Sequence, residues 1–159
     1  MTTPAGTTAA AAATGDWRTH LVESRDGIDR ILRDTRRIAV LGIKTADTGQ
    51  PAYYVPEYAQ QAGYEIVPVP VYYPEITEIL GEKVYRALRD IPGDVDMVNV
   101  FRRPKDIPPH LDDILAKRPK SVWFQLGIRN DAAAETLAKA GIDVVQDRCL
   151  LVELRRIGK

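Results

Sequence analysis

The chain has 159 residues, its 22 lysines and arginines balance 22 aspartates and glutamates, and 45% of its residues are hydrophobic. This length and composition predict one globular domain with a single core. A net charge of zero argues against a partner that attracts the whole protein electrostatically, such as nucleic acid, so any anion site must be local. We see no secretory signal, no membrane-spanning apolar run and no cysteine pair, and we therefore expect a cytoplasmic protein without a membrane partner.

The chain begins with a stretch that predicts no packed structure. Residues 1–16 are mostly alanine, threonine and glycine, which bury too little surface to offset the entropy of ordering, so we expect a disordered tail. Residues 17–159 then form the domain. Apolar residues from Trp17 onward recur near helical spacing and predict an N-terminal helix, with Asp16 as its cap and a kink at Gly27.

Short apolar runs alternate with amphipathic stretches along the rest of the chain. The runs predict five strands, at residues 38–42, 66–69, 95–101, 121–125 and 142–145. The clearest helices are predicted at residues 108–117 and 131–140, and residues 75–90 predict a turn, a short extended piece and a brief helix. This alternation is typical of a parallel sheet covered on both faces, so we expect an α/β, Rossmann-like three-layer fold.

A ligand crevice is expected where the chain changes direction across such a sheet, at the carboxyl ends of the strands. We predict the strand order 3-2-1-4-5, with the third strand at an edge. The crevice would then lie between the first and fourth strands, flanked by the loops after Gly42 and Gln125. The loops after Val69 and Phe101 would extend its wall.

The loop after the first strand contains Gly42, Ile43 and Lys44. A glycine permits close backbone approach, a lysine supplies positive charge, and amides at the next helix start can hold a phosphate. The loop matches neither GxGxxG nor a P-loop, and an ordinary connection with a solvated lysine is the alternative. Pro56 predicts that the next helix starts only near Val55, after an irregular segment whose Tyr53 could lie beside a ligand.

Two further strand ends carry candidate ligand groups. Val69 and Pro70 could form a stiff apolar wall for adenine, and the lack of an acidic residue there argues against NAD; a turn stiffened by prolines is the alternative. Phe101, Arg102 and Arg103 bring the densest positive cluster, whose guanidinium groups suit phosphate oxygens. Solvated arginines, or arginines paired with nearby carboxylates, are the alternative.

The end of the fourth strand offers polar and flexible groups. Gln125 could place an amide near the crevice, Gly127 permits a tight turn, and Asn130 can cap the following helix. Trp123 is expected in the core. The single cysteine, Cys149, lacks a histidine nearby in sequence, so we expect no nucleophilic or other catalytic residue.

His20, His110 and Cys149 lie far apart, without the paired spacing of zinc ligands. We therefore expect no metal site.

Four strings in this order resemble the small single-domain CoA-binding proteins of bacteria, over roughly residues 36–153. They are Gly81-Glu82-Lys83-Val84-Tyr85, residues 95–103, Val122-Trp123-Phe124-Gln125-Leu126-Gly127-Ile128 and Val145-Gln146-Asp147-Arg148-Cys149. That family is similar to the nucleotide-binding domain of the succinyl-CoA synthetase α subunit. The resemblance implies a Rossmann-like fold that holds the nucleotide part of coenzyme A, and it implies no particular reaction.

The chain differs from the common family form in the predicted site. Where the family has Pro-Ser-Tyr-Arg, this chain has Pro51-Ala52-Tyr53-Tyr54, and Lys44, Arg102 and Arg103 could replace the lost positive charge. Our leading hypothesis is noncatalytic binding of coenzyme A or an acyl-CoA. The alternatives are an acyl-CoA-dependent enzyme and a nucleotide-sensing regulatory or protein-interaction module, and a homo-oligomer is compatible with all three.

Overall fold

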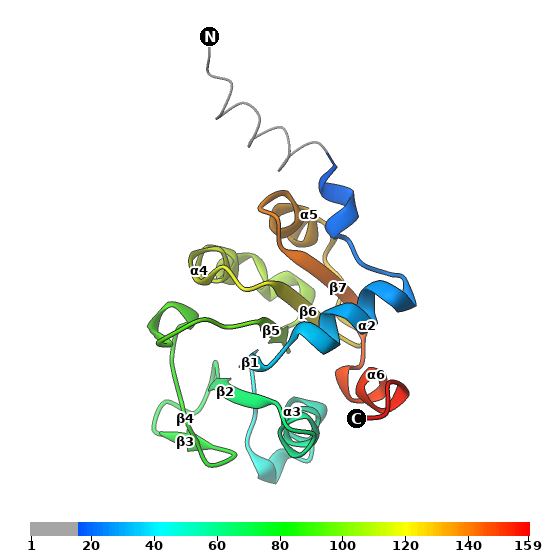
Figure 1. Cartoon of the computed structure of the whole chain (residues 1–159). Coiled ribbons are helices and arrows are strands. Elements are labelled where there is room, and N and C mark those ends of the chain that lie inside the picture. The colour runs from blue at the N-terminus through cyan, green and yellow to red at the C-terminus, as the bar shows by residue number, and fades with distance from the viewer. Residues whose placement is uncertain (1–15) are drawn as a thin grey trace.

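A five-stranded parallel sheet in the order β2-β1-β5-β6-β7 forms the centre of the molecule (Figure 1). This computed structural model describes residues 16–159. The strands are β1 (Arg37–Leu41), β2 (Glu65–Val69), β5 (Met97–Val100), β6 (Ser121–Gln125) and β7 (Asp143–Arg148). The α-helices are α2 (Arg25–Asp34), α3 (Pro51–Gln61), α4 (Leu111–Lys117), α5 (Asp131–Lys139) and α6 (Leu150–Arg156).

The predicted Rossmann-like fold and the five predicted strands are confirmed. Helices α2, α3 and α6 pack on one face of the sheet, and α4 and α5 pack on the other (Figure 1). Successive strand residues point to opposite faces, so Ile38 and Ala39 of β1 enter different hydrophobic clusters. Trp123 is fully buried, as predicted, and its indole N–H donates to the Arg148 carbonyl at 2.8 Å.

The predicted strand order is wrong for the third strand, β5. This strand pairs with β1 in the middle of the sheet rather than lying at an edge. The outer side of β2 cannot pair with another strand at Pro68. Pro68 has no N–H to donate there, and its carbonyl already accepts a hydrogen bond from the Tyr85 amide at 3.0 Å. The chain between β2 and β5 forms the hairpin of β3 (Glu78–Ile79) and β4 (Glu82–Lys83), then the short 3₁₀ turn Leu88–Asp90, and crosses to the other side of β1.

Helix α3 begins at Pro51, not near Val55 as predicted. Proline is favoured in the first turn of a helix, where its missing N–H is not needed. Pro56 does lie inside the helix, and its missing N–H leaves the Ala52 carbonyl without the usual partner four residues on. The Lys44 amide donates to that carbonyl at 3.1 Å, so the helix tolerates Pro56 by bonding to the loop after β1.

The N-terminal helix is interrupted, and the predicted kink at Gly27 is wrong. A 3₁₀ turn covers Trp17–His20, and Asp16 makes no side-chain cap bond to it. Residues 21 and 22 then run beside β7, and the Val22 amide donates to the Val144 carbonyl. Ser24 caps α2 by accepting from the Gly27 amide, which places Gly27 in the first helical turn. The rest of the predicted tail lies outside the described residues.

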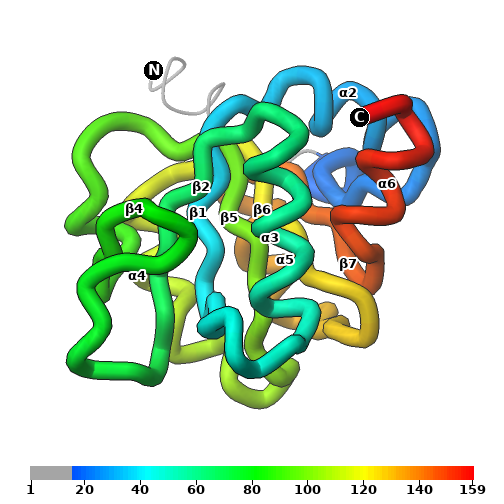
Figure 2. The backbone as a smooth tube through the Cα atoms, turned by 90° about the horizontal axis from the view of Figure 1, so that it is seen from below, coloured from blue at the N-terminus to red at the C-terminus, as the bar shows by residue number. Residues whose placement is uncertain are grey.

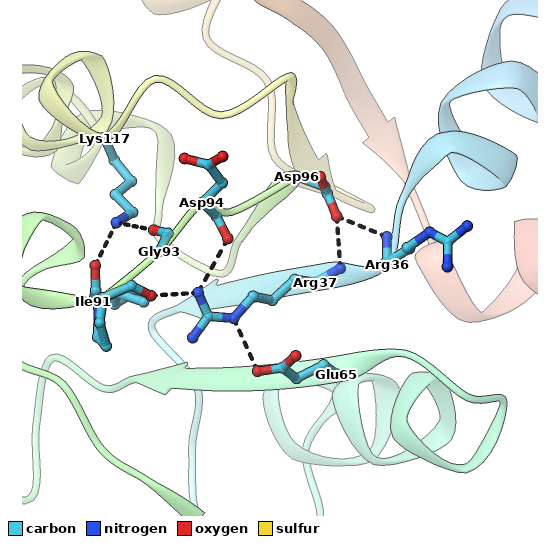
Figure 3. A network of polar contacts seen from close by, with 9 residues as sticks. Arg36, Arg37, Glu65, Ile91, Gly93, Asp94, Asp96 and Lys117 are labelled. Atoms are coloured by element: carbon cyan, nitrogen blue, oxygen red, sulfur yellow. Dashed lines mark hydrogen bonds and ion pairs between the residues drawn. The ribbon is translucent and has the colours of Figure 1, made fainter.

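The amino ends of the strands are held by a polar network (Figure 3). The Arg37 guanidinium donates to the carbonyls of Pro92 and Asp94 and forms an ion pair with Glu65. Asp96 accepts from the amides of Arg36 and Arg37, both at 2.9 Å. These bonds close the end of the sheet that lies opposite the predicted ligand crevice.

None of the helices in residues 16–159 combines the length and apolar character that crossing a membrane requires.

Candidate ligand-binding site

The chain changes direction across the sheet between β1 and β5. From β1 it passes to β2 on one side, and it later returns to β5 on the other side. The loops after β1 and β5 therefore flank the crevice that such a sheet forms. The prediction placed the loop after β6 in the position that the loop after β5 occupies.

Gly42 brings these two loops into direct contact. Its φ is +89°, and a Cβ added there would lie 2.4 Å from the Phe101 carbonyl oxygen. The Gly42 amide donates to the Val69 carbonyl at 2.8 Å, and the Phe101 amide donates to the Leu41 carbonyl at 2.8 Å. The structure thus brings Gly42, Val69 and Phe101 together at one edge of the sheet.

Arg102 lies beside this contact with most of its side chain buried. Only 16% of the side chain is exposed, and its Nε is buried with no hydrogen-bond partner among the described residues. The Asp106 carboxylate comes no closer than 4.0 Å to a terminal nitrogen of Arg102, and the Tyr72 ring centroid lies 5.9 Å from the guanidinium carbon. A buried guanidinium with so few partners can accept an anion from outside at low desolvation cost.

Arg103 points away from this arrangement. Its side chain is 71% exposed and forms an ion pair with Asp106 at 2.9 Å. The hydrogen bond from Arg103 lowers the pKa of Asp106, with the charge of Arg102 adding to the effect. Asp106 therefore stays ionised and serves as a counter-ion for two arginines.

The pKa of His110 is affected by its burial and by the charges of Arg102 and Asp106. Burial lowers its pKa, and the positive charge of Arg102 lowers it further, against the opposing effect of Asp113 and Asp106. The positive charge at this edge of the sheet therefore comes from arginine and lysine rather than from a protonated His110.

The predicted loop after β1 supplies fewer donors than its composition suggests. The amides of Gly42 and Lys44 bond within the protein, and in the first turn of α3 the Tyr53 and Tyr54 amides donate to the Gln50 carbonyl. The Lys44 ammonium donates to Gln50 Oε1 at 2.7 Å, and its partner is a neutral amide oxygen. Lys44 thus contributes a positive side chain to this loop, while the amides of Gly42 and Lys44 are used within the protein.

Three predicted site residues contribute through packing. Ile43 is 1% exposed and belongs to the core, and Pro70 is buried directly after β2. Tyr53 is half-buried on α3 and its hydroxyl lies 3.4 Å from Glu57 Oε2. Burial raises the pKa of Tyr53, and the Glu57 carboxylate raises it further.

Gln125 and Gly127 lie apart from the β1–β5 crevice. Gln125 Oε1 accepts from the Leu150 amide and from Asn99 Nδ2, at 3.3 and 3.4 Å, so its amide faces the start of α6. The Gly127 amide donates to Asp147 Oδ1 at 2.7 Å, beside β7. Asn130 caps α5 as predicted, by accepting from the Ala133 amide.

Sequence reasoning missed Tyr72, which lies near Arg102 of the crevice, and Asn99, a buried polar residue on the side of Gln125. Tyr72 is 57% exposed in an irregular loop, and only its distance to Arg102 identifies it. Asn99 is fully buried in β5 and its Oδ1 has no partner among the described residues. A polar residue inside an apolar strand was the available signal for Asn99, whereas Tyr72 gave only an aromatic residue between prolines.

A separate hollow of about 590 Å³ lies at the outer strand β7, where Trp17, Arg129 and Arg148 line it among other residues. Several of its polar groups are bonded to one another, among them Arg129, which pairs with Asp131 at 3.1 Å. Gln146 bonds the Asn130 amide and Asp131, and the lining contains acidic as well as basic groups. We therefore place the candidate site at the β1–β5 crevice. In the part of the chain that the structure describes, no cluster of three or more His, Cys, Asp or Glu side chains could hold a metal ion.

Comparison with known proteins identifies the family of this chain. A family model described as a CoA binding domain matches residues 36–155. The uncharacterized protein YneT of Bacillus subtilis is 36% identical over 129 residues, which cover 81% of this chain and 93% of that protein.

Solved structures show the same fold. The structure of cell-free ID.343 from Thermus thermophilus has 39% identity and a TM-score of 0.78, covering 85% of this chain and 99% of that one. A hypothetical protein from Pyrococcus horikoshii has 30% identity and a TM-score of 0.77, covering 84% and 92%.

Proposed function

Because the chain belongs to the CoA binding domain family, we propose that it binds coenzyme A or an acyl-CoA in the crevice between β1 and β5 and catalyses no reaction on it. The observation that carries this proposal is the buried guanidinium of Arg102, whose Nε has no partner in residues 16–159. A phosphate oxygen of the ligand would form a charge-assisted bond with this guanidinium group, 16% of whose side chain is exposed. Lys44, at the other side of the Gly42 contact, adds a second positive charge.

The neighbouring loop after β2 suits the adenosine part of the same ligand. Val69 and Pro70 are buried, and Tyr72 presents its exposed ring near Arg102. An adenine ring stacked on the exposed ring of Tyr72 would place its phosphates toward the arginine. This arrangement supports a nucleotide with several phosphates.

The ionic groups near the crevice favour binding without catalysis. Asp106 is the carboxylate nearest Arg102 and has a lowered pKa, which suits a permanent counter-ion better than a general acid. Cys149 lies half-buried at the cap of α6, after β7, two strands away from β5. We therefore assign no residue a catalytic role.

Calorimetric titration tests the proposal. Coenzyme A and acetyl-CoA should bind, and NAD and ATP should bind at least about tenfold more weakly, a difference near 1.4 kcal/mol. Arg102→Gln should weaken coenzyme A binding by about tenfold or more, since it removes a charge-assisted bond. Arg36→Gln makes the same charge change at the amino end of the sheet and should leave binding unchanged.

Failure of both CoA compounds to bind at millimolar concentration and low salt would refute the proposed ligand. The noncatalytic part is tested separately, by incubating the protein with acetyl-CoA and measuring release of free thiol. We expect the rate of the buffer alone. Thiol release that depends on protein concentration would make the protein an enzyme.

A further inference from the structure

Arg86 holds the loop after β2 in a defined shape. Its guanidinium donates to three backbone carbonyls of this loop: Tyr72 at 3.0 Å, Tyr73 at 2.6 Å and Ile76 at 2.9 Å. The loop between β2 and β3 has no helix or strand of its own. The planar fork of an arginine can bond several carbonyls at once, which makes Arg86 a bracket across this loop.

The bracket acts on a strained part of the backbone. Tyr73 has a φ of +61°, a left-handed conformation that costs a non-glycine residue about 1 kcal/mol or more. The turn is closed by the Ile76 amide, which donates to the Tyr73 carbonyl at 3.1 Å. Without Arg86, the Tyr72 and Tyr73 carbonyls, which flank the strained Tyr73 backbone, would lose their cationic donor.

The residue next to this strained position carries the exposed ring of the candidate site. Tyr72 packs edge-on against Tyr73, with ring centroids 6.4 Å apart, and lies 5.9 Å from the Arg102 guanidinium. The ring and the guanidinium therefore form a corner with one flat wall and one positive wall. Such a corner fits a purine ring with a phosphate close to it.

We propose that Arg86 is a positioning residue that fixes Tyr72 against Arg102, and that this corner selects ligands in which a phosphate lies next to an adenine nucleoside. This inference rests on the proposed binding of coenzyme A and adds the residue that orders its nucleotide end. The phosphate could be the 3′-phosphate of coenzyme A or its pyrophosphate. Titration with coenzyme A, dephospho-CoA and adenosine 3′,5′-bisphosphate separates the two sources.

The central experiment is a double-mutant cycle on coenzyme A affinity. Arg86→Gln and Tyr72→Ala should each weaken binding by about tenfold, since each disorders or removes one wall. If Arg86 acts through Tyr72, the double variant should be no weaker than Tyr72→Ala alone. A merely structural effect of Arg86 would instead add to that of Tyr72→Ala, and additive losses would overturn the inference.

Two controls isolate position from charge. Arg86→Lys keeps the charge but loses the planar fork, and it should still lose at least about threefold in affinity. Arg89→Gln removes a positive charge three residues away, where the side chain pairs with Asp113, and should leave affinity unchanged. Full affinity in Arg86→Lys would show that charge alone matters and would overturn the inference.

The outcomes distinguish this inference from the proposed function. If the unaltered protein does not bind coenzyme A, both fail together. If it binds coenzyme A and Arg86→Gln or Tyr72→Ala binds equally well, the positioning role fails alone. Circular dichroism and urea unfolding confirm that each variant folds. If Arg86→Gln does not fold, the double-mutant cycle is measured with Arg86→Lys and Tyr72→Ala instead.

Discussion

Gly42 sets the distance between the two loops that flank the crevice. Its missing side chain allows the Phe101 carbonyl oxygen to lie only 2.4 Å from where a Cβ would be, and its positive φ turns the chain out of β1. The carbonyl contact also places Arg102 beside the loop, with its Cδ 3.3 Å from that Cβ position. The geometry of the candidate site thus depends on the lack of a Cβ at Gly42.

Gly42→Ala should destabilise the protein by about 3 kcal/mol or more, because backbone strain and a steric overlap act together. Gly49→Ala is the matched control, since Gly49 also has a positive φ, of +63°, but has no atom within 4 Å of the added Cβ. It should cost only about 1 kcal/mol, from backbone strain alone. Urea unfolding of both variants measures the difference, and equal losses would show that the contact with Phe101 is unimportant.

Sequence reasoning reaches some of these residues and not others. Gly42 and Arg102 were named from the sequence, because a glycine at a strand end permits close backbone approach and the arginine lies in the densest positive cluster, although the sequence did not separate Arg102 from the exposed Arg103. The pairing of Arg86 with Tyr72 is not, because it spans 14 residues across an irregular loop. The buried placement of Ile43 also follows from the local path of the chain rather than from its residue type.

Among the elements, the strands were easiest to predict and the connections hardest. Each strand is a short apolar run with clear ends, whereas the position of β5 depends on what covers the far side of β2. Helix α6 was not predicted, because Leu150, Leu151 and Val152 form a continuous apolar run that hides the helical period. Figure 2 shows α6 lying beside α3, and the Tyr58 hydroxyl donates to the Lys159 carbonyl between them.

The buried side of α6 should contribute strongly to stability. Leu154 is fully buried, so Leu154→Ala should lower the free energy of unfolding by about 2–5 kcal/mol through lost burial and a cavity. Val152, two residues earlier, is 54% exposed, and Val152→Ala should change it by less than about 0.5 kcal/mol. Thermal or urea unfolding compares the two, and a small effect of Leu154→Ala would mean that α6 does not pack as described.

At the scale of the whole molecule, Asp96 joins three separate segments. It accepts from the amides of Arg36 and Arg37 at the start of β1, and it pairs with Lys120, just before β6, at 3.5 Å. Burial raises the pKa of Asp96, but the bonds from Arg37, Arg36 and Lys120 together outweigh burial and hold it below its ordinary value of 3.8. Protonation of this one carboxylate therefore loosens the amino ends of β1, β5 and β6 together.

A lowered pKa in the folded state means that Asp96 stabilises the protein above its unfolded-state pKa, and that this contribution disappears as the pH falls through the folded-state pKa. Asp96→Asn should therefore cost about 1–3 kcal/mol at neutral pH and very little near pH 2. Asp94→Asn makes the same change at a carboxylate that points away from the network (Figure 3) and should be nearly neutral. Urea unfolding at both pH values tests this, and a loss for Asp96→Asn that does not depend on pH would contradict it.

The hydrogen bond from the Lys44 amide to the Ala52 carbonyl gives Pro56 a structural role outside its own helix. A substitution such as Pro56→Ala would raise the intrinsic helical preference of α3, yet it would also introduce a competing donor for the one acceptor that tethers the first loop. At this position, a change that stabilises α3 weakens the hydrogen bond that holds the loop after β1. A screen for variants with a more stable α3 would therefore select a change that weakens the bond between the loop after β1 and the Ala52 carbonyl.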